Sequence, residues 1–304
     1  MAANRLTFKA TMAQISVPAT SANLGPGFDS LGLALELRDR YAAIILDTPD
    51  FDVDVTGEGA DEVKKDKNNL VVKAMLRGFE HMGTKPRGIA LRALNQTPHQ
   101  RGLGSSSSAI IGGLVLARKL VLSGEDLLTD DDVIALATEL EGHPDNVAAA
   151  FHGGATVSWT ESGIGKSIKL DVDPRIKAIA FIPESHLSTK KARNVLPETI
   201  SHHDAVMNSA RTALLTQALT VRPDLLFTAT EDFLHQSYRA ELMPKSIALV
   251  NKLRAAGVAA VISGAGPTVL VLHAGTDQDG EDIIHAAGDG FEAKKLAISS
   301  NGAL

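Results

Sequence analysis

The chain has 304 residues, of which 44% are apolar and 22% are charged, and none is cysteine. This composition is typical of a globular protein with two domains, since a domain usually has about 100–200 residues, and the lack of cysteine excludes disulfides, a thiolate nucleophile and cysteine-bound zinc. The formal net charge of −6, with acidic and basic residues interspersed, gives no reason to expect nucleic acid or an anionic membrane as a partner.

The beginning of the chain shows no targeting segment. It lacks an apolar core of signal-peptide length, and no run in the chain approaches the ~20 apolar residues of a membrane-spanning helix. We therefore expect a cytoplasmic protein without a membrane partner. Residues 1–10 are expected to be a loosely held extension, as chain termini commonly are.

Short strands follow this extension. Their apolar and alternating patterns lie at residues 13–18, 31–37, 41–46 and 51–55. The loop between the first two, Pro18 to Asp29, is rich in small residues, and a turn is its plainest interpretation. Asn23 and Asp29 nevertheless lie between apolar strands, and buried polar groups need partners, which a ligand could supply.

A helix and a strand come next. Apolar residues at helical spacing predict a helix over 71–83, which Asn69 precedes as a capping residue. A short strand over 89–94 then leads to a stretch of small and polar residues. This stretch is Pro98, His99, Gln100, Arg101, Gly102, Leu103, Gly104, Ser105, Ser106, Ser107 and Ser108. The helix that follows, over 109–121, is apolar nearly all round and should be buried.

The stretch from Pro98 to Ser108 is the strongest candidate for a binding site. Its two glycines allow close approach of the backbone, and the first N–H groups of the helix behind it have no partner within that helix. Together with the helix dipole, these groups favour a phosphate. Serine caps and turns explain the same residues about equally well. The spacing excludes a P-loop and the dinucleotide-binding glycine motif, so a nucleotide would be bound in another way.

A second polar cluster ends the helix predicted over 131–140. It consists of Glu139, Glu141, His143, Asp145 and Asn146. A short alanine-rich helix over 147–151 and a strand over 155–159 follow it directly. A charged turn is most often a solvated surface, but the small and apolar flanks of this one favour a site.

The composition changes near residue 165, where we place the boundary between domains of residues 1–164 and 165–304. In the second domain, strands are predicted over 168–170, 177–183, 259–263 and 269–273, and helices over 202–220, 223–235 and 244–256. A glycine-rich loop over 264–268 joins the last two strands. Residues 280–304 are expected to form a final helix and a fraying tail.

The glycine-rich loops and polar clusters together suit phosphoryl transfer. Transfer from ATP requires a backbone cradle for the phosphates, oxygen ligands for Mg²⁺ and a positioned hydroxyl. Ser106 and Glu141 form a candidate magnesium pair. Arg193, in a basic turn, and Arg239, between two predicted helices, are candidate bidentate donors to a carboxylate or phosphate of the substrate.

These segments resemble a known family. Residues 98–107 fit the pattern P-x-x-x-G-L-G-S-S-[AS] of the GHMP small-molecule kinases, and residues 263–268 are similar to the third motif of that superfamily. Other segments resemble the homoserine kinases within it: residues 18–29, 141–146, 191–197 and 234–239. The resemblance extends over about residues 12–272.

The resemblance implies a fold and an activity. The fold would be α+β in two domains, the first with a left-handed βαβ unit and the second ferredoxin-like, with the active site between them. The activity would be phosphorylation of the L-homoserine hydroxyl by ATP with Mg²⁺, giving O-phospho-L-homoserine for threonine biosynthesis, and the enzyme would be a homodimer. Another GHMP kinase substrate, such as mevalonate or a sugar, and a non-catalytic binding protein are the alternatives.

The resemblance also implies a role for each site residue. Pro98 to Ser108 would wrap the ATP phosphates, with Asn69 near the adenine. Ser106 and Glu141 would bind Mg²⁺, and Glu139 is the alternative ligand, because the spacing between glutamate and histidine is shorter here than in several relatives. The substrate would contact Asn23, Asp29, His143, Asp145 and Asn146 at its amino and hydroxyl end, and Arg193 and Arg239 at its carboxylate, with Gly264 and Gly266 beside them. Asp145 and Asn146 join Ser106 and Glu141 as the catalytic set. Asp145 would be either a general base or a substrate ligand, and we favour the ligand because a loose transition state needs no strong base.

Overall fold

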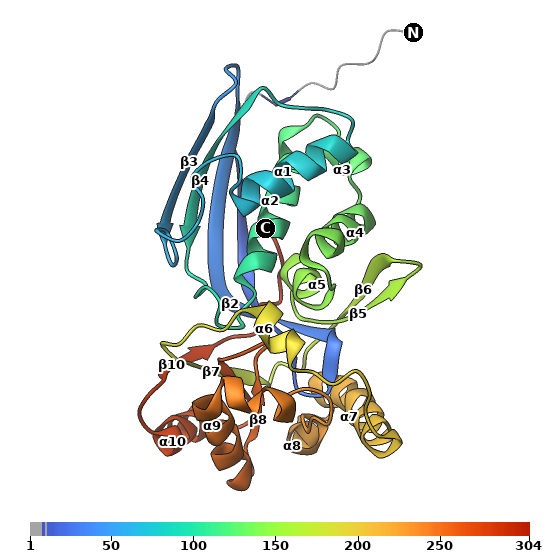
Figure 1. Ribbon diagram of the computed structural model, residues 1–304, viewed down its shortest axis with the longest axis vertical. Helices are drawn as coiled ribbons and strands as arrows, with labels where there is room; N and C mark the ends of the chain where they lie inside the picture. Colours follow the sequence, from blue (N-terminus) through green and yellow to red (C-terminus); the bar gives the residue numbers. More distant parts are fainter. Residues whose placement is uncertain (1–7, 10) are drawn as a thin grey trace.

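The computed structural model describes residues 8, 9 and 11–304, so most of the predicted N-terminal extension lies outside the described residues. Two sheets, each accompanied by helices, follow one another along the molecule (Figure 1). The first sheet contains β1 (Ala13–Asn23), β2 (Gly27–Leu46), β3 (Phe51–Gly57), β4 (Gly88–Asn95), β5 (Ala155–Glu161) and β6 (Ile164–Leu170). The helices beside it are α1 (Leu70–His81), α2 (Ser105–Leu120), α3 (Gly124–Leu127), α4 (Asp130–Glu141) and α5 (Asp145–His152).

The first sheet has the strand order β3-β4-β2-β5-β6, with β1 paired to β2 outside this path. β3 and β4 pair in parallel and are joined through α1, so they form a βαβ unit, and its left-handed crossover stays a prediction. In α1, Val72, Met75 and Phe79 are buried at helical spacing, and the side chain of Asn69 caps the helix by accepting a hydrogen bond from the Val71 N–H at 2.9 Å. The helix and its cap are therefore where the sequence predicted them.

The segment predicted as a loop from Pro18 to Asp29 is mostly a β hairpin, and that prediction was wrong. β1 continues to Asn23, and β2 begins at Gly27 after a three-residue turn. The strand end, residues 18–23, is made of small residues, most of which have a weak intrinsic strand preference, and pairing with β2 forms it in spite of that preference. β2 is also one strand of 20 residues where two shorter strands were predicted.

The second sheet contains β7 (Lys177–Ile182), β8 (Ala259–Ile262), β9 (Val269–His273) and β10 (Glu292–Leu296). The α-helices of this domain are α6 (Thr189–Asn194), α7 (His202–Thr220), α8 (Leu226–Ala229), α9 (Pro244–Ala255) and α10 (Asp277–Ala287), and its 3₁₀ helices are η1 (Pro223–Leu225) and η2 (Ser237–Leu242). The strand order is β10-β7-β9-β8, and all three pairs are antiparallel. Helices connect β7 to β8 and β9 to β10, so the order is βαββαβ and the predicted ferredoxin-like fold is confirmed.

The first domain extends past the expected boundary, and the end of the chain returns to it. β6, which starts at Ile164, pairs with β5, so residues 164–170 belong to the first sheet and the second sheet begins at Lys177. Leu304 exchanges two backbone hydrogen bonds of 2.9 Å with Ser16 in β1. The predicted fraying tail was therefore wrong, since the C-terminus lies beside the first sheet (Figure 1).

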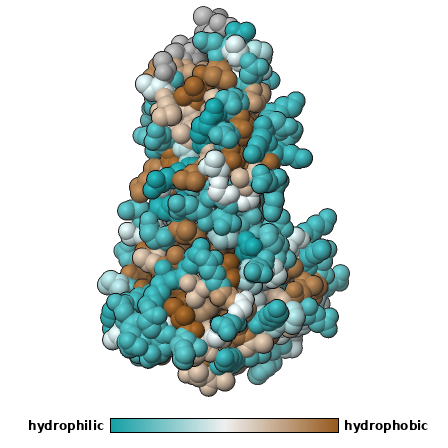
Figure 2. Space-filling view, turned by 90° about the vertical axis from the view of Figure 1, so that its left-hand side faces the viewer, coloured by the Kyte–Doolittle hydropathy of each residue, from teal (hydrophilic) through white to brown (hydrophobic). Residues whose placement is uncertain are grey.

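Apolar packing joins the domains. Leu31, Leu33 and Leu35 of β2 form one buried cluster with Leu215 and Leu219 of α7. Two further clusters lie within the domains, one between the first sheet and its helices and one around the second sheet. Hydrophilic and apolar residues are interspersed on the side of the molecule that carries β3 and β4 (Figure 2). No helix in the described ranges is long and apolar enough to cross a membrane.

Candidate active site

One cavity between the domains brings together most of the predicted site residues. From the first domain it is lined by Asn23, Asp29, Gly102, Gly104, Ser105, Ser106, Glu141, His143, Asp145 and Asn146. From the second domain it is lined by Arg193, Arg239 and Gly264. Segments separated by up to 241 residues therefore meet here, and Asn23 Nδ2 donates to the Gly264 carbonyl at 2.8 Å across the domain boundary.

The start of α2 is open toward this cavity. The helix begins at Ser105, four residues earlier than predicted, and its N-cap Gly104 has a φ of 72° and provides no side-chain cap. A Cβ at Gly104 would lie 1.9 Å from Thr20 Oγ1, so only glycine lets the loop approach β1 so closely. The first N–H groups of α2 thus remain available to an anion.

Glu141 meets the serines at the start of α2. Its Oε1 accepts hydrogen bonds from Ser106 Oγ at 2.6 Å and from Ser107 Oγ at 3.0 Å. The alternative ligand, Glu139, forms a bidentate pair with Arg77 on the surface, at 3.1 and 3.0 Å. Of the two glutamates, Glu141 is therefore the one that contacts Ser106.

Asp145 lies at the buried start of α5 with 2% of its surface exposed. Its Oδ1 accepts the Asn146 N–H and pairs with His143 Nδ1, each at 2.7 Å. Asn146 Oδ1 accepts a hydrogen bond from Thr20 at 2.8 Å. Burial disfavours the charged form of His143, but the hydrogen bond and charge of Asp145 outweigh burial and raise the pKa of His143 above its usual value.

Asn23 and Asp29 hold unusual backbone conformations at the edge of the cavity. Their φ angles are 69° and 55°, in a region that residues other than glycine seldom adopt. Asn23 Oδ1 accepts the Asp29 N–H at 3.0 Å, which ties the two residues together across the hairpin turn. Such strain is often retained at functional sites, where the surrounding structure maintains it.

Two arginines from the second domain enter the same cavity. Arg193 donates to both carboxylate oxygens of Asp29 at 3.0 and 2.6 Å, and this hydrogen bonding raises the pKa of Arg193. Arg239 is 1% exposed, and burial together with the nearby charge of Arg193 lowers the pKa of Arg239 to about 10. The ring of Phe28 lies 5.5 Å from the guanidinium carbon of each arginine. Asp29 and Arg193, which the resemblance assigned to opposite ends of the substrate, are thus paired with each other.

A second cavity shares Ser105 and Ser106 with the first. It is also lined by Tyr41, Val55, Val63, Asn69, Asn95 and His99. Asn69 therefore has two functions at once, as the cap of α1 and as a wall of this cavity. The two cavities thus meet at the two serines at the start of α2.

Comparison with known proteins identifies the family. The GHMP kinase N-terminal domain model matches residues 69–154, and the GHMP kinase C-terminal model matches residues 213–293. Homoserine kinase of Streptomyces avermitilis is 46% identical, over 97% of this chain and 96% of its own length, and that of Streptomyces coelicolor is 47% identical over 97% and 95%. The chain belongs to the homoserine kinase family.

Membership in this family also accounts for the fold. A crystal structure of homoserine kinase from Cytophaga hutchinsonii matches with a TM-score of 0.82 at 25% identity, over 99% of each chain. The predicted two-domain α+β architecture of the GHMP kinases is confirmed. GHMP kinases use ATP as the phosphate donor.

Not every predicted residue lines the central cavity. Arg101 points away from it and donates to the carbonyls of Pro183 and Glu184 at 2.9 and 3.0 Å, which links the loop to the end of β7. Gly266 faces Met243. The remaining predicted residues of the loop, namely Pro98, His99, Gln100, Leu103, Ser107 and Ser108, are also absent from its lining.

Sequence reasoning missed several residues of the site. Thr20 contacts Asn146, Phe28 contacts both arginines, and Thr189 lines the cavity. His235 was noticed only within the segment that resembles homoserine kinases. The signal for Thr20 was its place in the small-residue segment before Asn23. Because a loop was predicted there, the direction of its side chain could not be predicted.

Proposed function

We propose that the protein transfers the γ-phosphoryl group of ATP to the side-chain hydroxyl of L-homoserine. The observation that carries this proposal is the charge pattern of the central cavity, where the carboxylates of Asp29 and Asp145 and the guanidinium groups of Arg193 and Arg239 face the same space. An amino acid carries an ammonium and a carboxylate group and complements both pairs. Mevalonate carries a carboxylate but no ammonium group, so it would complement only the arginines, while Asp29 kept its ion pair with Arg193 and Asp145 its bond to His143.

The amino and hydroxyl end of the substrate is assigned to the first domain. One ligand atom from each of Asp29, His143 and Asp145 lies within 4.8 Å of the others, which is close enough for all three to contact a small polar group. The Oδ2 atom of Asp145 accepts no hydrogen bond from the described residues, while Oδ1 accepts three. We therefore assign Asp145 Oδ2 to the substrate, and Asn23 and Asn146 to the same end.

ATP is assigned to the start of α2 and to the cavity beside it. The open N–H groups behind Gly104 suit the phosphates, because they need no side chain at the point of contact. The cavity that contains Asn69, Tyr41 and Val55 suits the adenine. This arrangement places the terminal phosphate next to the residues assigned to homoserine, as in-line transfer requires.

The donor set around Glu141 fits Mg²⁺. Ser106 Oγ and Glu141 Oε1 are oxygen donors 2.6 Å apart, and Mg²⁺ in kinases takes one or two protein oxygens besides phosphates and water. When bound there, the ion would neutralise charge on the phosphates. The side chains of this chain orient the substrate hydroxyl, exclude water and balance charge, and a loose transition state requires no strong base.

An assay of ADP release tests this proposal. The enzyme is offered ATP and Mg²⁺ with L-homoserine, mevalonate or L-threonine, and we expect turnover with homoserine and little with mevalonate. Turnover of mevalonate but not of homoserine would contradict the proposal. We also propose that the protein forms a homodimer, which light scattering after gel filtration tests; its cytoplasmic location stays a prediction.

A further inference from the structure

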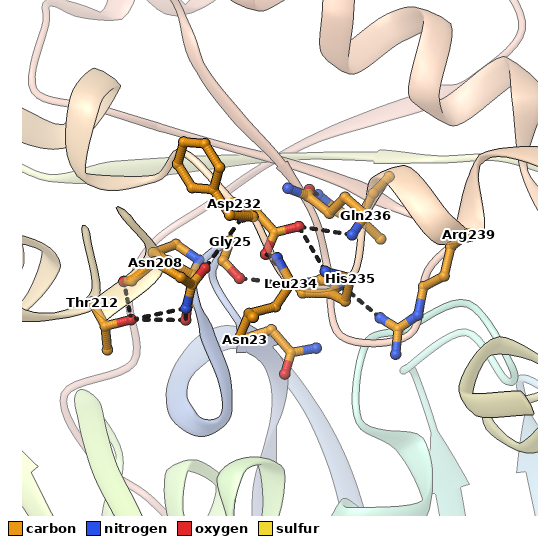
Figure 3. Close-up of polar contacts among 12 residues, drawn as sticks. Asn23, Gly25, Asn208, Thr212, Asp232, Leu234, His235, Gln236 and Arg239 are labelled. Carbon is orange, nitrogen blue, oxygen red and sulfur yellow. Dashed lines mark hydrogen bonds and ion pairs between the residues drawn. The ribbon is translucent and has the colours of Figure 1, made fainter. Parts of the chain in front are cut away.

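A buried set of hydrogen bonds runs from the turn between β1 and β2 to the guanidinium group of Arg239 (Figure 3). His235 is at its centre. Its Nε2 lies 2.9 Å from the carbonyl oxygen of Gly25, and its Nδ1 lies 2.8 Å from Nη1 of Arg239. His235 has no exposed surface and Arg239 is 1% exposed, so neither side chain can exchange these partners for water.

The partners determine the protonation of His235. A guanidinium nitrogen can only donate, so Nδ1 must accept from Arg239 and carry no proton. The carbonyl of Gly25 can only accept, so Nε2 must carry the proton. His235 is therefore a neutral imidazole of defined tautomer, and burial lowers its pKa in agreement with this state.

The backbone that carries His235 is itself fixed. The carboxylate of Asp232 accepts the N–H groups of Leu234, His235 and Gln236 at 3.0, 3.1 and 2.7 Å. These bonds hold the turn of residues 232–236 just before η2, and the imidazole projects from this turn (Figure 3). Replacing this carboxylate would leave three partly buried donors without their acceptor.

The turn on the other side of His235 is held by the same domain. Asn208 Nδ2 and Thr212 Oγ1, both in α7, donate to the carbonyl of Pro26 at 2.7 and 2.8 Å. His235 donates to the carbonyl of Gly25, so side chains of the second domain bind two successive backbone carbonyls of the first domain. The residues on either side of this turn include Asn23, which lines the substrate cavity.

The hydrogen bonds of Arg239 to the described residues leave one edge of its guanidinium group free. Nε donates to the Ala192 carbonyl at 3.0 Å, and Nη1 donates to His235 and to the Gly264 carbonyl, the latter at 3.3 Å. Nη2 finds no acceptor among the described residues. Three of the five guanidinium N–H groups are therefore used within the protein, and the two on Nη2 remain for a ligand.

We propose that His235 is a positioning residue that orients the guanidinium of Arg239 toward the substrate carboxylate. The orientation of Arg239 rests on the proposed function, because the carboxylate is that of homoserine. Changing His235 should therefore weaken homoserine binding selectively, whereas a general defect in folding would weaken the binding of both substrates. ATP is assigned to the other end of the cavity and should not be affected.

Two substitutions separate the two bonds of His235. In His235→Gln, the amide nitrogen can occupy the place of Nε2 and keep the bond to Gly25, but no acceptor remains near Nδ1. In His235→Asn, the amide oxygen can occupy the place of Nδ1 and keep the bond to Arg239, but the donor to Gly25 is lost. His273→Gln, which changes a partly buried histidine on β9 outside the site, is the matched control.

Steady-state kinetics of the full chain then test the role. We expect His235→Gln to raise the KM for L-homoserine about tenfold, the effect of one hydrogen bond to a charged group, with kcat and the KM for ATP nearly unchanged. The KM of His235→Asn for L-homoserine should lie close to that of the wild type, and His273→Gln should have the same KM as the wild type. Equal effects of the two His235 variants, an unchanged homoserine KM in His235→Gln, or a parallel rise in the KM for ATP would overturn the proposal.

Nitrogen-15 NMR of the histidine rings provides a readout that does not depend on the substrate. We expect His235 to be neutral and protonated on Nε2 at neutral pH. A charged ring or a proton on Nδ1 would refute the positioning role. If the wild type fails to phosphorylate homoserine while His235 shows the expected tautomer, the proposed function fails and the coupling of His235 to Arg239 stands.

Discussion

Replacing Asp145 by asparagine distinguishes a substrate ligand from a general base. The substitution preserves the shape of the side chain, and its Oδ1 can still accept hydrogen bonds from His143 and from the Asn146 N–H, as it does at 2.7 Å each in the structure. What it removes is the negative charge and the acceptor strength of Oδ2. The pKa of His143 should fall toward its usual value, because the charge of Asp145 is one of its causes.

Loss of a substrate ligand and loss of a general base differ in the size of their effect and in the kinetic parameter that changes. A hydrogen bond to a charged group contributes about 1.5–3 kcal/mol, so losing one to the homoserine ammonium or hydroxyl raises the KM roughly 10- to 150-fold. A general base contributes about 10²- to 10⁴-fold, and its loss appears in kcat. We expect the large rise in KM and a change in kcat of less than about tenfold.

Initial rates at saturating ATP and Mg²⁺, with L-homoserine varied, measure both parameters. Asp173→Asn is a matched control, since it removes another carboxylate that lies outside the cavity and is paired with Arg175. A fall in kcat of a hundredfold or more at unchanged KM would refute the reasoning and assign Asp145 as the base.

Further substitutions test the other parts of the site. Glu141→Gln should raise the Mg²⁺ concentration needed for half-maximal activity at least tenfold, roughly the loss of one charged ligand, whereas Glu139→Gln should leave the Mg²⁺ titration unchanged; the reverse result would make Glu139 the ligand. Gly104→Ala should raise the KM for ATP about tenfold, because its methyl group would meet a hydroxyl of β1 at 1.9 Å and displace the loop. Gly83→Ala, with a similar φ of 71° and open space around it, should lower only the stability, by about 1 kcal/mol. Equal KM values for ATP in the two variants would contradict this. His143 has a raised pKa, so its stabilising charge is complete below the unfolded value of about 6.5 and is lost as the pH rises through the folded value. Denaturant unfolding from pH 6 to 9 should show the wild type losing stability relative to His143→Gln, and parallel pH profiles would exclude this role.

The sequence predicted best those features that depend on local chemistry. The glycines and serines before α2 indicated an anion site, and Gly104 does leave the start of that helix without a side-chain cap. The cluster around Asp145 was recognised because polar residues between small apolar flanks are unusual. The helix over 202–220 was predicted with its observed bounds, and local capping by Ser201 sets where it starts.

Features that depend on contacts between distant segments were missed. β10 is a short, charged strand that exists because it pairs with β7, more than a hundred residues earlier, and no local pattern reveals that pairing. The ion pair between Asp29 and Arg193 joins residues 164 positions apart. The choice between Glu139 and Glu141 likewise depended on the end of α4, where one glutamate faces solvent and the other faces Ser106.

Identification of the product by phosphorus-31 NMR tests the central claim most directly. The enzyme is incubated with ATP, Mg²⁺ and L-homoserine, and the spectrum is recorded without proton decoupling. We predict a phosphomonoester signal split by two methylene protons, as in O-phospho-L-homoserine, that grows as ADP is formed. ADP formation with inorganic phosphate as the only new phosphorus signal would contradict the assignment, because it would show that the site hydrolyses ATP and does not phosphorylate the amino acid.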